Sequence, residues 1–378
     1  MRALATIMIS IVLLTSPLGG TDLLKTKGSD YGLRGRVRQS IERTTYPASD
    51  YVGERTVTTT LEFSAEGRLL QRRVGTLTGN DYVATYTYDA AGRVLKVSSG
   101  NETESGITKF DTTYNYDANG QLISINSGSG TQPTIYDTDQ AGRKRVTAHF
   151  PELPAKPNVA VGAVPWEGSD LPFPPPSGGT VTSIYDEQNR PVEALVHDAN
   201  GNLTMRLVRT YDKQGNIEGD KLIPEKTQIQ VPEELAGQLN DAQRKAMAAF
   251  IARAFYTGES SYKYDAEGRT VEKHVTGGVR GDTLTTIRYN DHGDISEEIT
   301  LETPRADLAG EFRIDEAGNP SPVSNSKAPE RTRTETHYSY EYDAQGNWSK
   351  KTTTSASGAG EPITSAIVER TLTYYPDR

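Results

Sequence analysis

A short β-hairpin pattern, repeated along most of the chain, constrains the fold more than any other feature of the sequence. It is clearest at residues 85–97, which read TYTYDAAGRVLKV. Tyr86 and Tyr88 are two residues apart, so in a strand both side chains lie on one face. Asp89 and Gly92 occupy the first and last positions of a four-residue turn, where these residue types are favoured. Each copy is therefore predicted to be two antiparallel strands joined by a tight turn.

Copies of this hairpin recur at a nearly constant interval. Their turn glycines are Gly67, Gly92, Gly120, Gly142, Gly268, Gly293, Gly318 and Gly346. Within the first four and within the last four, successive glycines are 22 to 28 residues apart. Such a period indicates a repeat architecture, and it fits two strands with two turns. Between the two groups lie three closer copies, in which Asn189 takes the first glycine position because asparagine tolerates positive φ. Residues 31–45 are predicted to form a first, degenerate strand pair.

Composition narrows the classes of function. Only 34% of the residues are hydrophobic, and the 20 tyrosines far outnumber the 7 phenylalanines, which suits a half-exposed sheet. The net charge of −9 is spread along the chain without a basic patch, so nucleic acid is not an expected partner. The absence of cysteine excludes disulfides and thiol chemistry.

The N-terminus has the pattern of a signal peptide. Arg2 precedes a 12-residue apolar run, residues 3–14, and small residues follow it. The run is shorter than the ~20 residues that span a bilayer. We therefore expect residues 1–20 to be removed, and the mature protein to be exported without an integral membrane segment. The alternatives are an uncleaved anchor or a buried strand.

Two stretches interrupt the repeats. Residues 150–180 contain eight prolines and are predicted to be an extended insertion or linker. Residues 224–258 carry the only helical pattern, with Pro232 in a first turn and Asn240 or Asp241 as the cap of a second segment. The predicted organisation is thus a signal peptide followed by one β domain, residues 21–378, with a proline-rich and an α-helical insertion.

The pattern Y-x-Y-D-x-x-G-R-L resembles the YD repeat of the Rhs (rearrangement hotspot) and teneurin proteins. The residues that carry the resemblance are Tyr86, Tyr88, Asp89, Gly92, Arg93, Tyr114, Tyr116, Asp117, Gly120, Tyr262, Tyr264, Asp265, Gly268, Arg269, Tyr340, Tyr342, Asp343 and Gly346. The resemblance implies a mainly β fold, in which antiparallel hairpins join into a long curved or spiralling sheet. In large members the sheet closes into a shell around a C-terminal toxin. This chain has fewer repeats, no long C-terminal region and no self-cleavage motif, so we expect neither a closed shell nor toxin delivery. It is similar instead to short, secreted YD-repeat proteins of Gram-negative bacteria.

The aspartates of the turns are the most numerous candidates for chemistry. They are Asp89, Asp117, Asp139, Asp186, Asp198, Asp212, Asp265, Asp315 and Asp343. General acid and base catalysis needs one pair at a fixed separation, whereas here one residue recurs at one turn position, as a structural Asx-turn requires. One carboxylate per turn is also too few for calcium. The five histidines lack metal-ligand spacing. We therefore name no catalytic residue, metal ligand or cofactor.

The tyrosine rows are the best candidate binding surface. Aromatic rings along one face of a sheet can hold sugar rings, whereas the structural alternative is cross-strand ladders that stabilise a thin sheet. The possible ligand-binding residues are Tyr86, Tyr88, Tyr114, Tyr116, Tyr262, Tyr264, Tyr340 and Tyr342.

We expect a non-catalytic protein with a structural or binding role in the bacterial envelope or extracellular space. Its expected partners are glycans or a cell-surface protein. The alternatives are a carbohydrate-binding module that uses the tyrosine face and an enzyme that acts on polysaccharide.

Overall fold

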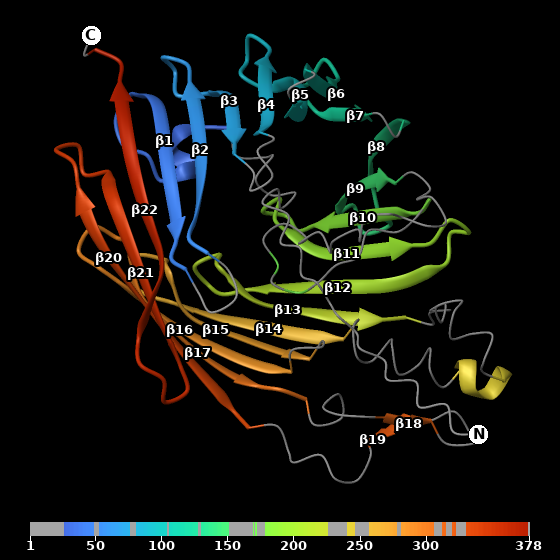
Figure 1. The fold of residues 1–378 in the computed structure, drawn as a ribbon. Coiled ribbons are helices and arrows are strands. Elements are labelled where there is room, and N and C mark those ends of the chain that lie inside the picture. Colours follow the sequence, from blue (N-terminus) through green and yellow to red (C-terminus); the bar gives the residue numbers. More distant parts are fainter. Residues whose placement is uncertain are drawn as a thin grey trace.

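The protein was analysed as a computed structural model, in which strands and the turns between them dominate (Figure 1). The structure describes residues 26–48, 53–75, 81–103, 106–127, 130–150, 169, 171, 178–225, 240–245, 257–277, 281–305, 312–314, 320–322 and 330–376. The predicted signal peptide lies outside the described residues. Within them, no helix is both long and apolar enough to cross a bilayer.

Twenty strands form one antiparallel sheet. In its first half they are β1 (Val37–Tyr46), β2 (Arg55–Phe63), β3 (Leu69–Val74), β4 (Asp81–Tyr88), β5 (Val94–Thr103), β6 (Gly106–Tyr116), β7 (Leu122–Ser127), β8 (Gly130–Thr138), β9 (Lys144–His149) and β10 (Thr180–Tyr185). In its second half they are β11 (Pro191–His197), β12 (Leu203–Tyr211), β13 (Ile217–Pro224), β14 (Gly258–Tyr264), β15 (Thr270–Gly277), β16 (Asp282–Tyr289), β17 (Ile295–Thr303), β20 (Thr332–Tyr342), β21 (Trp348–Ser357) and β22 (Ile363–Tyr374).

The sheet closes on itself into a barrel. Each strand pairs with the next, β17 pairs with β20, and β22 pairs with β1, so every strand has a partner on both sides. Figure 1 shows β22 beside β1. The expectation of an open curved or spiralling sheet, with too few repeats to close, was therefore wrong. Closure removes both sheet edges, whose backbone groups would otherwise be left unpaired.

Side-chain hydrogen bonds reinforce the closing seam. The hydroxyl of Tyr375 donates to the carbonyl oxygen of Phe63 at 2.8 Å, across the seam. The buried Asn347 accepts from the backbone N–H of Arg34 at 2.6 Å, and its amide donates to the carbonyl oxygen of Arg34 at 2.9 Å. The two ends of the described chain are thus held together by side chains as well as by the β1–β22 ladder.

The repeated turns have one geometry. In the turn after β4, the backbone N–H of Gly92 donates to the carbonyl of Asp89 at 3.0 Å, and Gly92 has φ +85°. The register shifts between Thr87 and Tyr88, and comparable bulges flank most of the other repeat turns. Asn189 is the one non-glycine residue with positive φ in the described chain, at 58°. The prediction for its position is confirmed.

Antiparallel alternation divides the turns between two rims. The turn rim is the end of the barrel where the repeat turns after β2, β4, β6, β8, β10, β12, β14, β16 and β20 lie. Because Val37 pairs with Tyr374, the start of β1 and the end of β22 also lie there. The loop rim is the opposite end, and it carries the long connections after β9, β13 and β17, together with one repeat turn, Asp198 to Gly201.

The structure departs from the sequence-based expectations at two copies. Residues 31–45 contain one strand, β1, instead of a strand pair, because the 3-10 turn η2 (Gly28–Tyr31) and Gly32 and Gly35 with positive φ precede it. The copy around Gly318 forms a separate two-stranded sheet of β18 (Phe312–Ile314) and β19 (Pro320–Pro322) rather than part of the barrel. β17 pairs directly with β20 in its place.

Both insertions are described only in part. Residues 241–245 are helical, and Asn240 caps them, since its side chain accepts from the N–H of Gln243 while the Gln243 side chain accepts from the N–H of Asn240. The remainder of the predicted helical insertion lies outside the described residues, apart from its ends in β13 and β14. In the proline-rich insertion, Ser169 and Leu171 are buried.

The core consists of two hydrophobic clusters on the inner face of the barrel. By strand alternation and register, one set of side chains in each strand faces this interior. The first cluster contains Leu33, Val37, Leu61, Phe63, Leu69, Ala84, Tyr86 and Val97. The second contains Leu171, Val181, Ala194, Val196, Met205, Leu207 and Leu222. The second cluster thus combines strands β10–β13 with a residue of the proline-rich insertion.

Candidate functional site

The second tyrosine of each repeat joins neighbouring hairpins. The hydroxyl of Tyr116 donates to the carbonyl oxygen of Val94, in the preceding hairpin, at 2.9 Å. Tyr88 and Tyr264 make equivalent bonds at 2.6 and 2.8 Å. Half-buried rings with satisfied hydroxyls fit a cross-strand structural role. These residues therefore act as staples between repeats.

The other predicted binding tyrosines lie in different surroundings. Tyr86 is buried in the first hydrophobic cluster, and Tyr114 packs against that cluster. The hydroxyl of Tyr340 donates to a backbone carbonyl at 2.8 Å, and that of Tyr342 donates to the Asp294 carboxylate at 2.7 Å. Ligand binding by the tyrosine row stays a prediction.

Tyr262 and Tyr264 lie on β14, two residues apart, so they share one face of the strand. By strand alternation, the tyrosines of the predicted binding row lie on the inner face of the barrel.

The aspartates of the described turns hold the backbone. Asp117 Oδ1 accepts from the N–H of Asn119 at 2.9 Å and from that of Gln121 at 2.8 Å. The predicted Asx-turn is thus confirmed there and recurs in the other described turns, whereas Asp315 lies outside the described residues. At Asp89, the backbone N–H of Arg93 contributes most to lowering the pKa of the carboxyl. The Asp89 carboxylate is therefore ionised and engaged at neutral pH.

Where an arginine follows the turn glycine or Asn189, it can link successive turns, a role that sequence reasoning missed. Arg93 Nε donates to Asp89 Oδ2 at 2.6 Å, and its guanidinium lies 4.7 Å from the ring centre of Tyr116 in the next hairpin. A Cβ on Gly120 would lie 2.4 Å from Arg93 Nη1. The same stacking recurs between Arg190 and Tyr211. Its signal was present in the sequence as the recurrent arginine four residues after the aspartate.

A second group of polar side chains faces the interior from β1, β17, β20, β21 and β22. We call it the inner charge cluster, and its members are Glu42, Glu298, Tyr338, Lys351 and Arg370, beside Trp348. Register brings it together: Arg370 pairs with Glu42, and Lys351 pairs with Tyr340 and Val368. Since its members come from strands far apart in the sequence, sequence reasoning had no signal for it.

Arg370 is the most buried member of this cluster. Its Nε donates to Glu42 Oε1 at 2.9 Å, and its guanidinium carbon lies 3.3 Å from the ring centre of Trp348. The side chain is 5% exposed, yet its Nη1 atom has no hydrogen-bond partner. A buried guanidinium N–H without an acceptor is costly, so Nη1 is a donor that the described chain leaves unused.

Lys351, on the neighbouring strand β21, differs from Arg370 in lacking a direct ion pair among the described residues. Its ammonium is 4.6 Å from the ring centre of Tyr338, whose hydroxyl donates to Glu298. Within the described part of the chain, no carboxylate forms an ion pair with Lys351. Burial lowers its pKa, while the charges of Glu298 and Glu42 act in the opposite direction. Among the described residues, Lys351 therefore lies near an aromatic ring and two carboxylates without a direct ion pair to either.

A fully buried ion pair lies elsewhere on the same face. Arg209 Nε and Nη2 donate to the two oxygens of Asp220 at 2.7 and 3.0 Å, with side-chain exposures of 1% and 0%. This bidentate geometry satisfies the carboxylate. The pair is closed to solvent, which suits a structural role.

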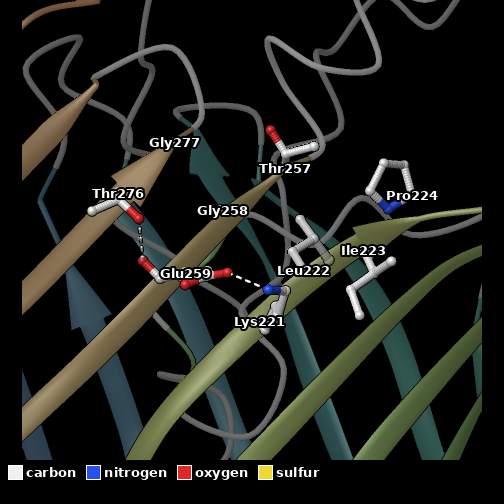
Figure 2. A pocket seen from close by; sticks show the side chains of 9 residues that line it. All are labelled: Lys221, Leu222, Ile223, Pro224, Thr257, Gly258, Glu259, Thr276 and Gly277. Carbon is white, nitrogen blue, oxygen red and sulfur yellow. Dashed lines mark hydrogen bonds and ion pairs between the residues drawn. The ribbon is translucent and has the colours of Figure 1, made fainter.

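A shallow pocket of about 350 Å³ lies at the loop rim, between β13, β14 and β15 (Figure 2). Lys221 and Glu259 form an ion pair in its wall, and Thr276 donates to the backbone carbonyl of Glu259 at 3.5 Å. Both charged side chains are more than half exposed, so their pairing contributes little free energy. The pocket brings together none of the tyrosines of the predicted binding row.

The histidines are dispersed. His292 stacks on Tyr342 with ring centres 3.9 Å apart, and His274 lies 2.8 Å from an Asp282 oxygen. His337 faces Glu297 at 3.6 Å. No group of three or more metal-ligating residues gathers within the described ranges.

Comparison with known proteins identifies the repeat. Residues 38–143 match the family model described as the Teneurin YD-shell. None of the curated proteins compared with this sequence matches it.

Solved structures show only a loose likeness in fold. A porin-like protein from Bacteroides uniformis is 9% identical, with 90% of this chain and 99% of that chain covered and a TM-score of 0.33. One from Bacteroides vulgatus is 8% identical over 90% and 98%, with a TM-score of 0.21. A putative outer membrane lipoprotein-sorting protein domain from Vibrio parahaemolyticus is 10% identical over 50% and 79%, with a TM-score of 0.15. TM-scores this low support no functional argument.

The family match covers the first hairpins, and the staples and turns just described continue the same construction through β22. The repeat of this chain is accordingly similar to that of the teneurin YD-shell, whose family model matches residues 38–143.

Proposed function

We propose that this protein is an exported, non-catalytic YD-repeat barrel with a structural or binding role in the bacterial envelope or extracellular space. One observation carries the proposal: the residues that define the repeat build the barrel wall. Tyrosine hydroxyls bond to neighbouring carbonyls, and turn aspartates bond to their own backbone. The repeated tyrosines and aspartates therefore have structural roles in the barrel wall.

The protonation state of the turn aspartates supports a non-catalytic role. Backbone and side-chain donors lower the pKa of Asp139 and of Asp198, as they do for Asp89. A general acid at neutral pH needs a raised pKa, and paired carboxylates need pKa values that differ. These turns have the opposite property, and they share it with one another.

Export rests on the N-terminal pattern of Arg2, the apolar run and the small residues that follow. Expression of the full chain in a Gram-negative host, followed by cell fractionation and N-terminal sequencing, tests it. We expect a mature protein outside the cytoplasm that begins near residue 21. Full-length protein retained in the cytoplasm would contradict this part of the proposal.

Catalysis is tested separately. The purified protein is incubated with a panel of acidic and neutral polysaccharides, and new reducing ends are measured. We expect none. Release of reducing ends that a single Asp or Glu substitution abolishes, in a variant that still folds, would establish the enzyme alternative.

The inner charge cluster favours a second function, carbohydrate binding. The tyrosine row alone gives no site of this kind, because several of its hydroxyls are engaged within the wall. Trp348, Tyr338 and two cationic side chains on one face do combine aromatic rings with unused donors.

A further inference from the structure

We infer that the inner charge cluster binds the carboxylate group of an acidic sugar, and that Arg370 and Lys351 contact this carboxylate. The inference deepens the binding role proposed above and rests on it. It begins with geometry: two cationic side chains from adjacent strands, β21 and β22, face the same interior space.

Arg370 provides an unused donor. Glu42 engages its Nε and Nη2 atoms, at 2.9 and 2.7 Å, and leaves Nη1 without a partner. Guanidinium groups bind carboxylates through paired N–H donors, and the pairing is strongest where water is excluded. A carboxylate from a ligand would satisfy Nη1 without displacing Glu42.

Lys351 provides an ammonium group that makes no direct ion pair within the described chain. Its ammonium lies over the Tyr338 ring, while the neighbouring carboxylate of Glu298 accepts the Tyr338 hydroxyl. The cluster holds two carboxylates and two cations, but only Glu42 and Arg370 form a direct ion pair, because Glu298 accepts the Tyr338 hydroxyl instead of contacting Lys351. A ligand carboxylate between the two cations would contact the Lys351 ammonium and Arg370 Nη1 together.

The aromatic residues favour a sugar as the carrier of this carboxylate. Arg370 covers one face of Trp348, and the ring of Tyr340 lies 6.5 Å from that of Trp348 at an angle of 58°. Such rings bind the C–H faces of sugars, and the nearby hydroxyls of Tyr338 and Thr353, on the same face, can orient them. We therefore expect a uronic acid within a polysaccharide.

The strand itself offers a matched control. Lys350 precedes Lys351 on β21, so its side chain points to the opposite, outer face, where it pairs with Glu341 at 3.4 Å. Lys351→Met and Lys350→Met remove the same charge one residue apart, on opposite sides of the wall.

The test is calorimetric titration of the full chain with three probes: a galacturonic acid trimer, its methyl ester and a glutamate hexapeptide. We expect the trimer to bind, Lys351→Met to weaken it about tenfold or more, and Lys350→Met to leave it unchanged. Arg370→Lys, which keeps the charge beside Glu42 but removes the unpaired guanidinium N–H, should also weaken it. The ester and the peptide should bind at least tenfold more weakly than the trimer.

Thermal melting provides a second readout that does not depend on the ligand. Because burial lowers the pKa of Lys351, its charge opposes folding at neutral pH. Lys351→Met should raise the melting temperature of the free protein relative to Lys350→Met. A lysine needed only for packing would give a lower melting temperature instead.

Four results would overturn the inference. Equal affinities of Lys351→Met and Lys350→Met for the trimer would show that the cluster is not the binding site. Binding of the methyl ester as tight as that of the acid would show that the carboxylate is not recognised, although a carbohydrate-binding role would survive. Equally tight binding of the peptide would show that the sugar is not recognised. Absence of binding by all three probes would also overturn the inference. The proposed export is tested separately by cell fractionation, so its failure can be distinguished from the failure of this inference.

Discussion

The two rims of the barrel are built from the same strands but on different principles. At the turn rim, arginines link several hairpin ends to the next: Arg93 bonds to Asp89 and stacks on Tyr116 in the following repeat, and Arg190 stacks on Tyr211. The loop rim carries connections of very different lengths, and the one repeat turn there, at Gly201, has no atom within 4 Å of the position of an added Cβ. The motif therefore stabilises a turn locally wherever it occurs, but it joins repeats only where turns stand side by side.

The proline-rich insertion at the loop rim contributes to the core, because Leu171 is buried in the second hydrophobic cluster. Leu171→Ala removes that contact and leaves a cavity, so we expect it to lower the free energy of unfolding by about 2–5 kcal/mol. Chemical denaturation measures the change. A loss below about 0.5 kcal/mol would mean that the insertion does not pack on the barrel.

Turn glycines at the two rims should respond unequally to alanine. Gly120 and Gly201 both have positive φ, near +80°, which costs alanine about 1–2 kcal/mol at either position. At Gly120 the new Cβ would also displace Arg93. We expect Gly120→Ala to lower the free energy of unfolding by roughly 1 kcal/mol more than Gly201→Ala. Equal losses would show that the arginine stack contributes nothing.

Removing a tyrosine hydroxyl should also cost more stability at the turn rim than at the loop rim. Tyr116→Phe removes the bond to the Val94 carbonyl and should cost about 0.5–1.5 kcal/mol. Tyr46 lies at the loop rim, and its hydroxyl has no hydrogen bond within the described chain, so Tyr46→Phe should change stability by less than about 0.5 kcal/mol. Denaturant midpoints of the two variants, compared with the parent, decide the matter. Indistinguishable midpoints would contradict the staple.

Alkaline pH should weaken the turn rim through its buried hydroxyls. Burial raises the pKa of Tyr88 from 10.0 to about 12, and burial together with Asp343 does the same for Tyr374. The folded state therefore keeps protons that the unfolded state loses, so this stability is complete below pH 10 and falls as the pH rises to 12. Unfolding measured at several pH values should show the decline. A flat profile between pH 10 and 12 would contradict it.

Much of the hairpin array could be predicted from the sequence because its determinants are local. Asp89, Gly92 and Asn189 specify turns by their own backbone preferences, and alternation specifies which face the tyrosines share. The copy at Phe312–Ile314 and Pro320–Pro322 shows the limit of that reasoning, since a turn pattern predicts a hairpin but not which sheet it joins.

Closure and the inner charge cluster could not be predicted for one shared reason. Both depend on pairings between distant parts of the chain, such as Glu42 with Arg370, and no local pattern encodes them. The second tyrosine of each repeat was visible as a motif, yet its bond to the preceding hairpin became evident only from the strand order. Repeat number alone was a poor guide to closure.

The β1–β22 seam is the most direct test of the closed barrel. Arg43 and Glu369 are exposed register partners across this seam, and the chain has no native cysteine. Arg43→Cys combined with Glu369→Cys, oxidised and examined by mass spectrometry, should form a disulfide within the monomer. Arg43→Cys with Glu341→Cys, on the non-adjacent strand β20, should keep free thiols. Free thiols in both pairs would show that the sheet is open.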